Sequence, residues 1–419
     1  MHRGLKPTID EGDAFTIVHA ADLHLGSGMK VARRLGHTNE LREATYEALG
    51  SLMSLVKERE ASILTLGGDL FDEADQLNPT PRRKLRDALA SLSDVHVAIV
   101  RGNHDHHNPR APVVEYPPNV MEFEGTRKTL DLGWVRIHGV SYSSARVNES
   151  LLPRHPPASS DHFDIGLLHA NVGGNPEHAP YAPCSFEELK RFGYRMWLLG
   201  HIHKRLVLCE DPLILYPGNV QGRDAGELGP KSAEVVSVDE TGSVRHESVP
   251  VHSVLWQTQT LDVTGCTTID EVLDLARTSA KRWSESLKGE RGLIVRLQVV
   301  GQTEAHEHLA RTPEPGLPDA AELIQQEIHD EFANADPFIL VDAVRVNTTI
   351  PLDLERLAES ETAPGVLVQL GGRDDVFKRA VEALRAESPS SEDVESIARL
   401  LWPSALQGAL GRIRGRPSP

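Results

Sequence analysis

Five short segments rich in aspartate, asparagine and histidine hold the residues of this 419-residue chain best suited to chemistry. In chain order they are Asp22-Leu23-His24, Gly68-Asp69-Leu70-Phe71-Asp72, Gly102-Asn103-His104-Asp105, Leu167-Leu168-His169-Ala170 and Gly200-His201-Ile202-His203. They offer carboxylate, amide and imidazole groups, a mixed oxygen and nitrogen set that suits divalent metal ions. Two such ions held close together are a common means of activating water against a phosphoester.

The five segments differ in how specific they are. Asp22 and His24 alternate along an extended stretch and can point to the same side, but Asp-x-His often arises by chance. Asn103-His104-Asp105 also suits an ordinary turn, and a histidine such as His169 at the end of an apolar run is often a core residue. The metal hypothesis therefore depends on all five segments occurring together in this order.

Each segment follows a stretch that we predict to be a β-strand. These strands cover residues 15–20, 63–66, 95–100, 164–169 and 196–199, and helices are predicted over 39–59 and 82–92. Continuous apolar strands that alternate with helices indicate buried sheets covered by helices. We therefore expect an α/β fold in which two sheets face each other, with helices outside. Loops beyond the strand ends can then converge on one cleft.

The rest of the chain predicts two further regions. Residues 1–250 form the expected catalytic domain. Residues 251–350 show the order β-α-β-α-β, with a capping box at Thr268 to Glu271, and predict a small α+β accessory or capping domain. Residues 351–419 are predicted to be mostly helical.

Composition limits the partners and the location of the protein. No apolar run is long enough to span a bilayer, and the N-terminus lacks the apolar core of a signal peptide, so we expect a cytoplasmic protein without a membrane partner. The net charge is −17, from 44 basic and 61 acidic residues. A strongly acidic chain is not typical of a protein that binds DNA by itself.

Two groups of basic residues lie near the first two segments. They are Lys30, Arg33 and Arg34, and then Arg82, Arg83, Lys84 and Arg86. Either group could contact a phosphate backbone beside the cleft. Ordinary solvated charges on helices and loops are the simpler explanation of both groups.

The order Asp-x-His, Gly-Asp-x-x-Asp, Gly-Asn-His-Asp, His, Gly-His-x-His resembles the calcineurin-like metallophosphoesterase superfamily. Within it, residues 21–26, 68–72, 199–205 and 216–223 resemble the DNA-repair exonuclease branch of SbcD and YhaO-like proteins. The resemblance implies a calcineurin-like four-layer metallophosphoesterase β-sandwich flanked by helices. It also implies a small α+β C-terminal cap domain and a helical C-terminal segment.

The resemblance also implies a set of metal ligands. One ion would be bound by Asp22, His24, Asp69 and His203, and the second by Asp69, Asn103, His169 and His201. Manganese is the ion that the family implies for both sites, although the ligand types alone also admit iron or zinc.

By the same resemblance, a hydroxide that bridges the two ions would attack phosphorus, and His104 would act as general acid. Asp72 or Asp105 would fix the tautomer of His104. Four residues near the last metal segment are candidates for substrate binding: Lys204, Arg205, Asn219 and Arg223.

Together these expectations predict that the chain is a dinuclear-metal phosphodiesterase, and more narrowly a DNA exonuclease or endonuclease subunit in DNA repair. The family further implies a homodimer and a coiled-coil ATPase partner of the SbcC type, which would supply the affinity for DNA. Two alternatives stay open. One is a phosphatase or phosphodiesterase for small phosphoesters or cyclic nucleotides, and the other is a non-catalytic, metal-bound scaffold.

Overall fold

The structure is a computed structural model that divides into two compact units. It describes residues 8–28, 36–72, 77–124, 129–174, 181–311, 313, 316–351, 357–360, 362–387, 395, 398–399, 402, 405–406 and 409. The first unit comprises Met1–Gln259, Arg277–Leu297 and Gln325–Val344, and the second comprises Thr260–Ala276, Gln298–Ile324 and Arg345–Pro419. The division falls within long strands and helices, so the three regions expected from the sequence remain a prediction.

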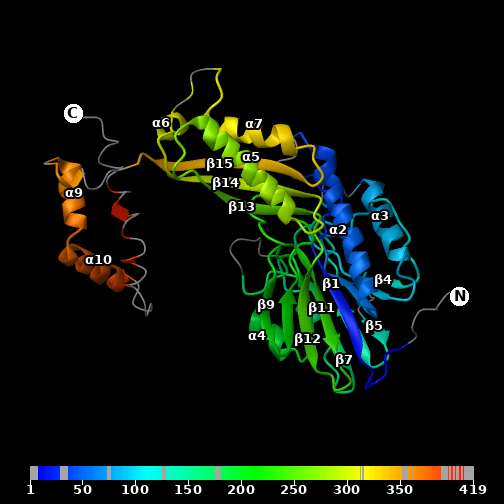
Figure 1. Cartoon of the computed structure of the whole chain (residues 1–419). Helices are drawn as coiled ribbons and strands as arrows, with labels where there is room; N and C mark the ends of the chain where they lie inside the picture. The colour runs from blue at the N-terminus through cyan, green and yellow to red at the C-terminus, as the bar shows by residue number, and fades with distance from the viewer. Residues whose placement is uncertain are drawn as a thin grey trace. The chain divides into compact units, whose positions relative to one another are not determined.

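Two six-stranded sheets form the centre of the first unit (Figure 1). The first has the order β12 (Val244–Pro250), β11 (Ser232–Val238), β1 (Phe15–Ala20), β2 (Ile63–Leu66), β3 (His96–Ile99) and β4 (Val120–Glu122). The second has the order β5 (Thr129–Leu132), β6 (Val135–Gly139), β7 (Phe163–His169), β8 (Met196–Gly200), β10 (Leu213–Tyr216) and β9 (Leu206–Glu210). Strands β1 to β4 are parallel, as are β6, β7, β8 and β10.

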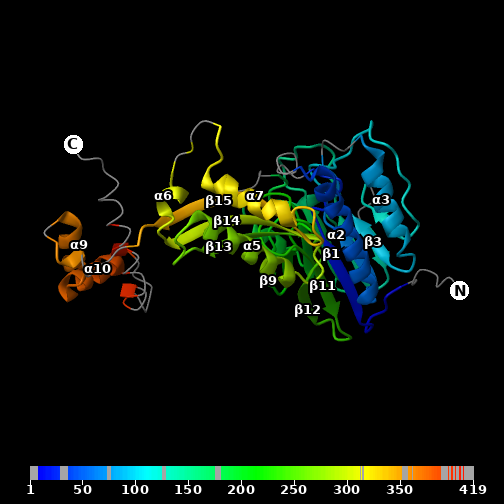
Figure 2. The ribbon, with the colours of Figure 1, turned by 45° about the horizontal axis from the view of Figure 1, so that its top comes forward.

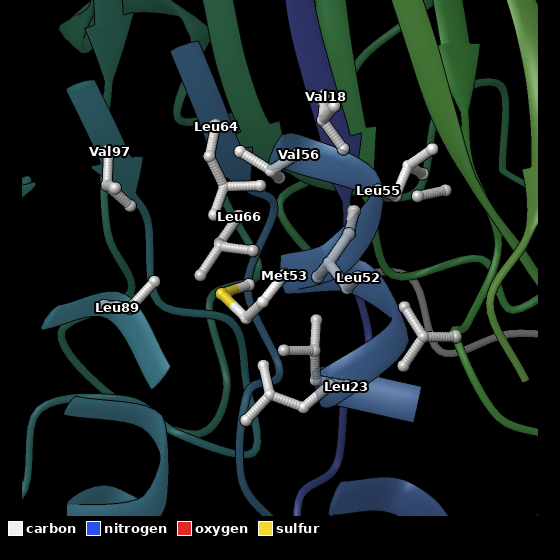
Figure 3. Packing of buried hydrophobic residues seen from close by; sticks show 14 of the residues in the cluster. Val18, Leu23, Leu52, Met53, Leu55, Val56, Leu64, Leu66, Leu89 and Val97 are labelled. Carbon is white, nitrogen blue, oxygen red and sulfur yellow. The ribbon is translucent and has the colours of Figure 1, made fainter. Parts of the chain in front are cut away.

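Alternate residues of these strands enter different apolar layers, because successive side chains in a strand point to opposite faces. Ile17 of β1 and Ile63 of β2 pack with Ile165 and Leu198 of the second sheet. Their neighbours Val18 and Leu64, by contrast, pack on the other face of the first sheet (Figure 3).

Helices α2 (Thr38–Glu58) and α3 (Pro79–Ala90) cover that face and lie side by side (Figures 1 and 2). Leu52 and Val56 of α2 and Leu89 of α3 supply the apolar contacts. Helix α3 begins before the predicted residue 82, because the Asn78 side chain caps it by accepting a hydrogen bond from the Thr80 N–H at 3.0 Å.

The outer face of the second sheet is covered by the short helix α4 (Phe186–Arg191), the 3-10 helix η2 (Leu152–Arg154) and the loops near them. Trp197 and Leu199 of β8 pack there with Leu189 of α4. The layers are therefore helix, sheet, sheet, and helix with loops. This confirms the predicted α/β fold of two facing sheets.

A third sheet has the order β13 (Val254–Asp262), β14 (Gly292–Gln302) and β15 (Phe338–Thr349). Helix α5 (Ile269–Ser286) connects β13 to β14, and α6 (His306–Leu309) and α7 (Ala320–Phe332) lie between β14 and β15 in the chain. Helices α9 (Ala363–Gly371) and α10 (Asp374–Glu387) follow. Among the described residues, none of the helices has the length and apolar character needed to cross a membrane.

We expect Leu64→Ala to lower the free energy of unfolding by about 2–5 kcal/mol, because it leaves a cavity under α2 and α3. Leu64 is fully buried. Leu77→Ala is the matched control, since Leu77 is 60% exposed and should change stability by only about 0.5 kcal/mol. Chemical denaturation measures both, and equal effects of the two substitutions would contradict the packing described above.

Candidate metal centre

The polar segments identified in the sequence meet at the carboxyl ends of parallel strands from both sheets. Three groups of side chains have candidate ligand atoms within 4.8 Å of one another. The groups are Asp22, His24 and His203; His24, Asp72 and His104; and Asp69, His169 and His201. Asn103 joins the third group, because its Oδ1 lies 3.2 Å from His169 Nε2. All seven predicted metal ligands are therefore brought together.

Four of these residues have an unusual backbone. Asp22, His24, Asp69 and His201 have φ values of 53°, 44°, 52° and 101°. Non-glycine residues rarely adopt positive φ, and such positions often mark functional sites held in place by the surrounding structure. Asp22, Asp69 and His201 lie within three residues of the ends of β1, β2 and β8, so the chain turns there directly after each strand.

Glycines allow the strand ends to approach closely enough to share ligands. A Cβ atom at Gly102 would collide with Asp69 Oδ1 and with the ring of His169. A Cβ atom at Gly200 would collide with the carbonyl oxygen of Gly67, which belongs to the other sheet's loop. Only glycine fits these two positions without moving the ligands.

Three of the histidines are oriented by a hydrogen bond from the ring nitrogen Nδ1. His24 donates to Asp72 Oδ1 at 2.5 Å, His203 to Glu227 Oε1 at 2.6 Å, and His169 to the Gly67 carbonyl oxygen at 2.9 Å. Such partners fix the tautomer and turn the other nitrogen, Nε2, toward a metal ion.

The arrangement of Nε2 atoms fits a bound cation. His24 Nε2 and His203 Nε2 lie 3.3 Å apart, and His203 Nε2 lies 3.8 Å from Asp22 Oδ1. Without a metal ion, a proton on one Nε2 would let the two rings share a hydrogen bond, and with a metal ion, both Nε2 lone pairs are free to bind it. A divalent ion satisfies both nitrogens and the carboxylate.

Burial and mutual attraction set the charges of these groups. Burial raises the pKa of Asp22 to about 6 and lowers the pKa of His24 to about 4. Burial favours the neutral forms of Asp69 and His169 as well, but their attraction dominates. It holds the pKa of Asp69 below its usual range and raises the pKa of His169 to about 9. The carboxylate of Asp69 is therefore stabilised by the neighbouring imidazolium of His169.

His104 occupies the more exposed side of the centre. Its side chain is 39% exposed, and its ring centroid lies 5.0 Å from that of His24. Its backbone N–H donates to Asp69 Oδ1 at 2.8 Å. Asp72 Oδ1 lies 3.8 Å from His104 Nδ1 but is closer to His24, so its main hydrogen bond orients a metal ligand.

Asp105 has a different environment from the one expected. It is buried, and its oxygens accept hydrogen bonds from the backbone N–H groups of Gly102 at 2.6 Å and Leu70 at 2.8 Å. These bonds tie the His104 loop to the Asp69 loop. The expected role of fixing the His104 tautomer therefore does not match where the Asp105 oxygens point.

The four candidate substrate-binding residues differ in position. Lys204 is exposed. Arg205 instead pairs with the buried carboxylate of Glu234, at 2.9 and 2.6 Å. Asn219 is fully buried, and Arg223 lies beside the centre, with its Nη1 at 3.2 Å from Asp72 Oδ1. Lys30, Arg33 and Arg34 lie outside the described residues.

Glu227 is the important residue that the sequence analysis missed. Besides His203, its carboxylate accepts hydrogen bonds from Asn219 Nδ2 at 2.9 Å and from the Arg223 backbone N–H at 2.7 Å. It lies soon after the stretch 216–223, which resembled the family, but it has no local pattern of its own. Its role follows only from its contact with His203.

Comparison with known proteins agrees with this geometry. Residues 15–205 match the family model of calcineurin-like phosphoesterases, and residues 256–349 match the middle domain of metallophosphoesterase YhaO. The uncharacterized metallophosphoesterase YhaO of Bacillus subtilis is 30% identical over 338 residues, which cover 78% of this chain and 81% of YhaO. The DNA double-strand break repair protein Mre11 of Methanopyrus kandleri is 24% identical, over 91% of this chain and 85% of that protein.

Among solved structures, purple acid phosphatase PPD1 from yellow lupin is 12% identical with a TM-score of 0.38, over 58% of this chain and 53% of that chain. The fold, the ligand set and the YhaO match together define the class. The chain belongs to the calcineurin-like metallophosphoesterases, in their YhaO-like branch, and thus to a family of phosphoester hydrolases.

We expect Glu227→Gln to weaken the binding of divalent metal by about 10- to 100-fold, because the amide no longer holds the His203 ring as a charged acceptor does. A chelator competition titration measures this affinity. Glu240→Gln, in the exposed turn between β11 and β12, is the control and should bind metal as the wild type does. Equal affinity in the Glu227 variant would show that His203 needs no such support.

Proposed function

We propose that this chain hydrolyses phosphodiester bonds of DNA by means of two divalent metal ions, with manganese as the ion used. The main support is the geometry of the ligand groups at the strand ends: Asp69 groups with His169 and His201, and its carboxylate also accepts a hydrogen bond from the backbone N–H of the more exposed His104. The similarity to a protein named for DNA double-strand break repair supports DNA as the substrate.

The residues divide between two metal positions. Asp22, His24 and His203 would hold one ion, and Asn103, His169 and His201 the other, with Asp69 shared by both. The ions would supply Lewis acidity and an activated water molecule for attack at phosphorus.

His104 is the side chain placed to transfer a proton to the leaving oxygen. Its ring is accessible, and its backbone N–H is fixed by Asp69. Arg223 would bind a non-bridging phosphate oxygen, because its side chain lies beside Asp72 at the edge of the same centre. Lys204, which is exposed next to His203, would add a second positive charge along the substrate.

The proposal predicts that the protein loaded with manganese cleaves labelled duplex DNA, alone or with its partner, as well as the small ester bis-p-nitrophenyl phosphate. Chelation of metal should abolish both activities. Turnover of the small ester without any cleavage of DNA, with the partner present, would instead favour a phosphodiesterase for small substrates.

We further propose that a coiled-coil ATPase partner supplies much of the affinity for DNA and that the chain forms a homodimer. The net charge of −17 supports the first part, since DNA repels an acidic chain. Co-purification followed by mass determination tests both proposals. A monomer that neither co-purifies with an ATPase nor needs one for tight DNA binding would contradict them.

We expect His104→Ala to lower kcat by about 100- to 10,000-fold, as the loss of a general acid does, while the content of bound metal stays the same. Steady-state assays and elemental analysis measure the two quantities. His308→Ala, at an exposed histidine of α6, should keep full activity. Wild-type activity in the His104 variant would support a non-catalytic metal-bound scaffold instead.

A further inference from the structure

A pocket of about 400 Å³ lies beside the loop that carries Asn103 and His104. Its polar lining includes Arg82, Arg101 and His107. Asp105 lines it as well and accepts a hydrogen bond from the Leu70 backbone N–H at 2.8 Å. The pocket and the candidate metal centre therefore both border on this short loop.

Arg82 is the residue of this pocket that points to a ligand. Its guanidinium carbon lies 4.7 Å from the centroid of the Phe71 ring. Its Nε atom is buried and has no hydrogen-bond partner, and no ion pair joins Arg82 to another described residue. A buried N–H group without a partner costs free energy, and such a group commonly indicates a site that a ligand completes.

The other arginine of the pocket is already neutralised. Arg101 binds Glu122 through two hydrogen bonds, at 2.8 and 2.9 Å, and also contacts Glu124. Two of the three acids that line the pocket, Glu122 and Glu124, thus face Arg101, and the third, Asp105, accepts hydrogen bonds from backbone N–H groups. Arg82 keeps its positive charge uncompensated by direct contact with any described carboxylate.

The position of Arg82 links the pocket to catalysis. Phe71, on which Arg82 stacks, is followed directly by Asp72, which contacts both His24 and His104. A guanidinium stacked on an aromatic ring keeps its edge free to bind two phosphate oxygens at once. Val113, another residue of the lining, is 92% exposed and, together with Pro109 and Pro112, offers an apolar surface for a sugar or base.

We propose that Arg82 and this pocket bind the phosphate group next to the phosphodiester that is cleaved. The site would then hold a stretch of polynucleotide and not only a single ester. This inference rests on the proposed function, because the scissile phosphate is placed at the metal centre.

Calorimetric titration of the full chain with thymidine 3′,5′-bisphosphate and with thymidine 5′-monophosphate tests the proposal at one fixed concentration of manganese. The wild type should bind the bisphosphate more tightly. Arg82→Gln should reduce this preference by about tenfold or more, as expected for a lost hydrogen bond to a charged group. Arg82→Lys should show a preference between those of the wild type and Arg82→Gln. Lysine keeps the positive charge but lacks the planar guanidinium that can bind two phosphate oxygens at once.

Arg86→Gln is the matched control, because Arg86 lies on the same helix α3, is exposed and pairs with Asp87 at 2.6 Å. It should keep the wild-type preference. A wild type without preference for the bisphosphate would overturn the proposal, as would an equal loss in the Arg82 and Arg86 variants. Thermal unfolding midpoints confirm that the variants are folded.

This experiment can be separated from the test of the proposed function, because it measures binding without turnover. If the protein cleaves no DNA but prefers the bisphosphate through Arg82, the pocket stands and the DNA nuclease proposal fails. If it cleaves DNA but shows no preference that depends on Arg82, only the pocket is wrong.

Discussion

The two sheets are joined at their carboxyl ends by hydrogen bonds that cross from one sheet to the other, and the metal ligands depend on these bonds. His169, the last residue of β7, donates to the carbonyl oxygen of Gly67, which follows β2. The N–H of His201, just beyond β8, donates to Asp22 at 3.1 Å. His19 of β1 also reaches the Leu199 carbonyl oxygen at 3.0 Å. These bonds bring candidate ligands from the two sheets close enough to share an ion.

This arrangement explains why divalent metal ions would suit the centre. Asp22, His24, Asp69 and His169 are almost completely buried. Buried charges are costly unless they are paired, and several of these groups face one another as acceptors. Bound metal would therefore favour the same packed state that the cross-sheet hydrogen bonds build, and occupancy of the centre would then be coupled to stability of the fold.

A second connection leads from the centre toward the third sheet. Glu227, which orients His203, lies in a loop whose neighbours contact Trp256 of β13. Trp256 Nε1 donates to the Gly222 carbonyl oxygen at 3.1 Å, and the Gly229 N–H donates to the Trp256 carbonyl oxygen at 2.8 Å. The loop that carries Glu227 is thus hydrogen-bonded to Trp256 of β13 on both sides of Glu227.

The sequence by itself determined the two-sheet α/β class and several strands and helices to within a few residues, and through its resemblance to a family it predicted seven metal ligands that the fold brings close together. It could do so because strand periodicity and ligand chemistry are local properties of short segments. The partners of these segments depend on tertiary contacts. Only the folded chain shows that Glu227 accepts a hydrogen bond from His203, that Arg205 pairs with Glu234, and that Arg82 lies over the Phe71 ring beside a pocket. Each of these contacts joins residues far enough apart in the chain that no spacing rule relates them, and their geometry is set by how the sheets and loops pack.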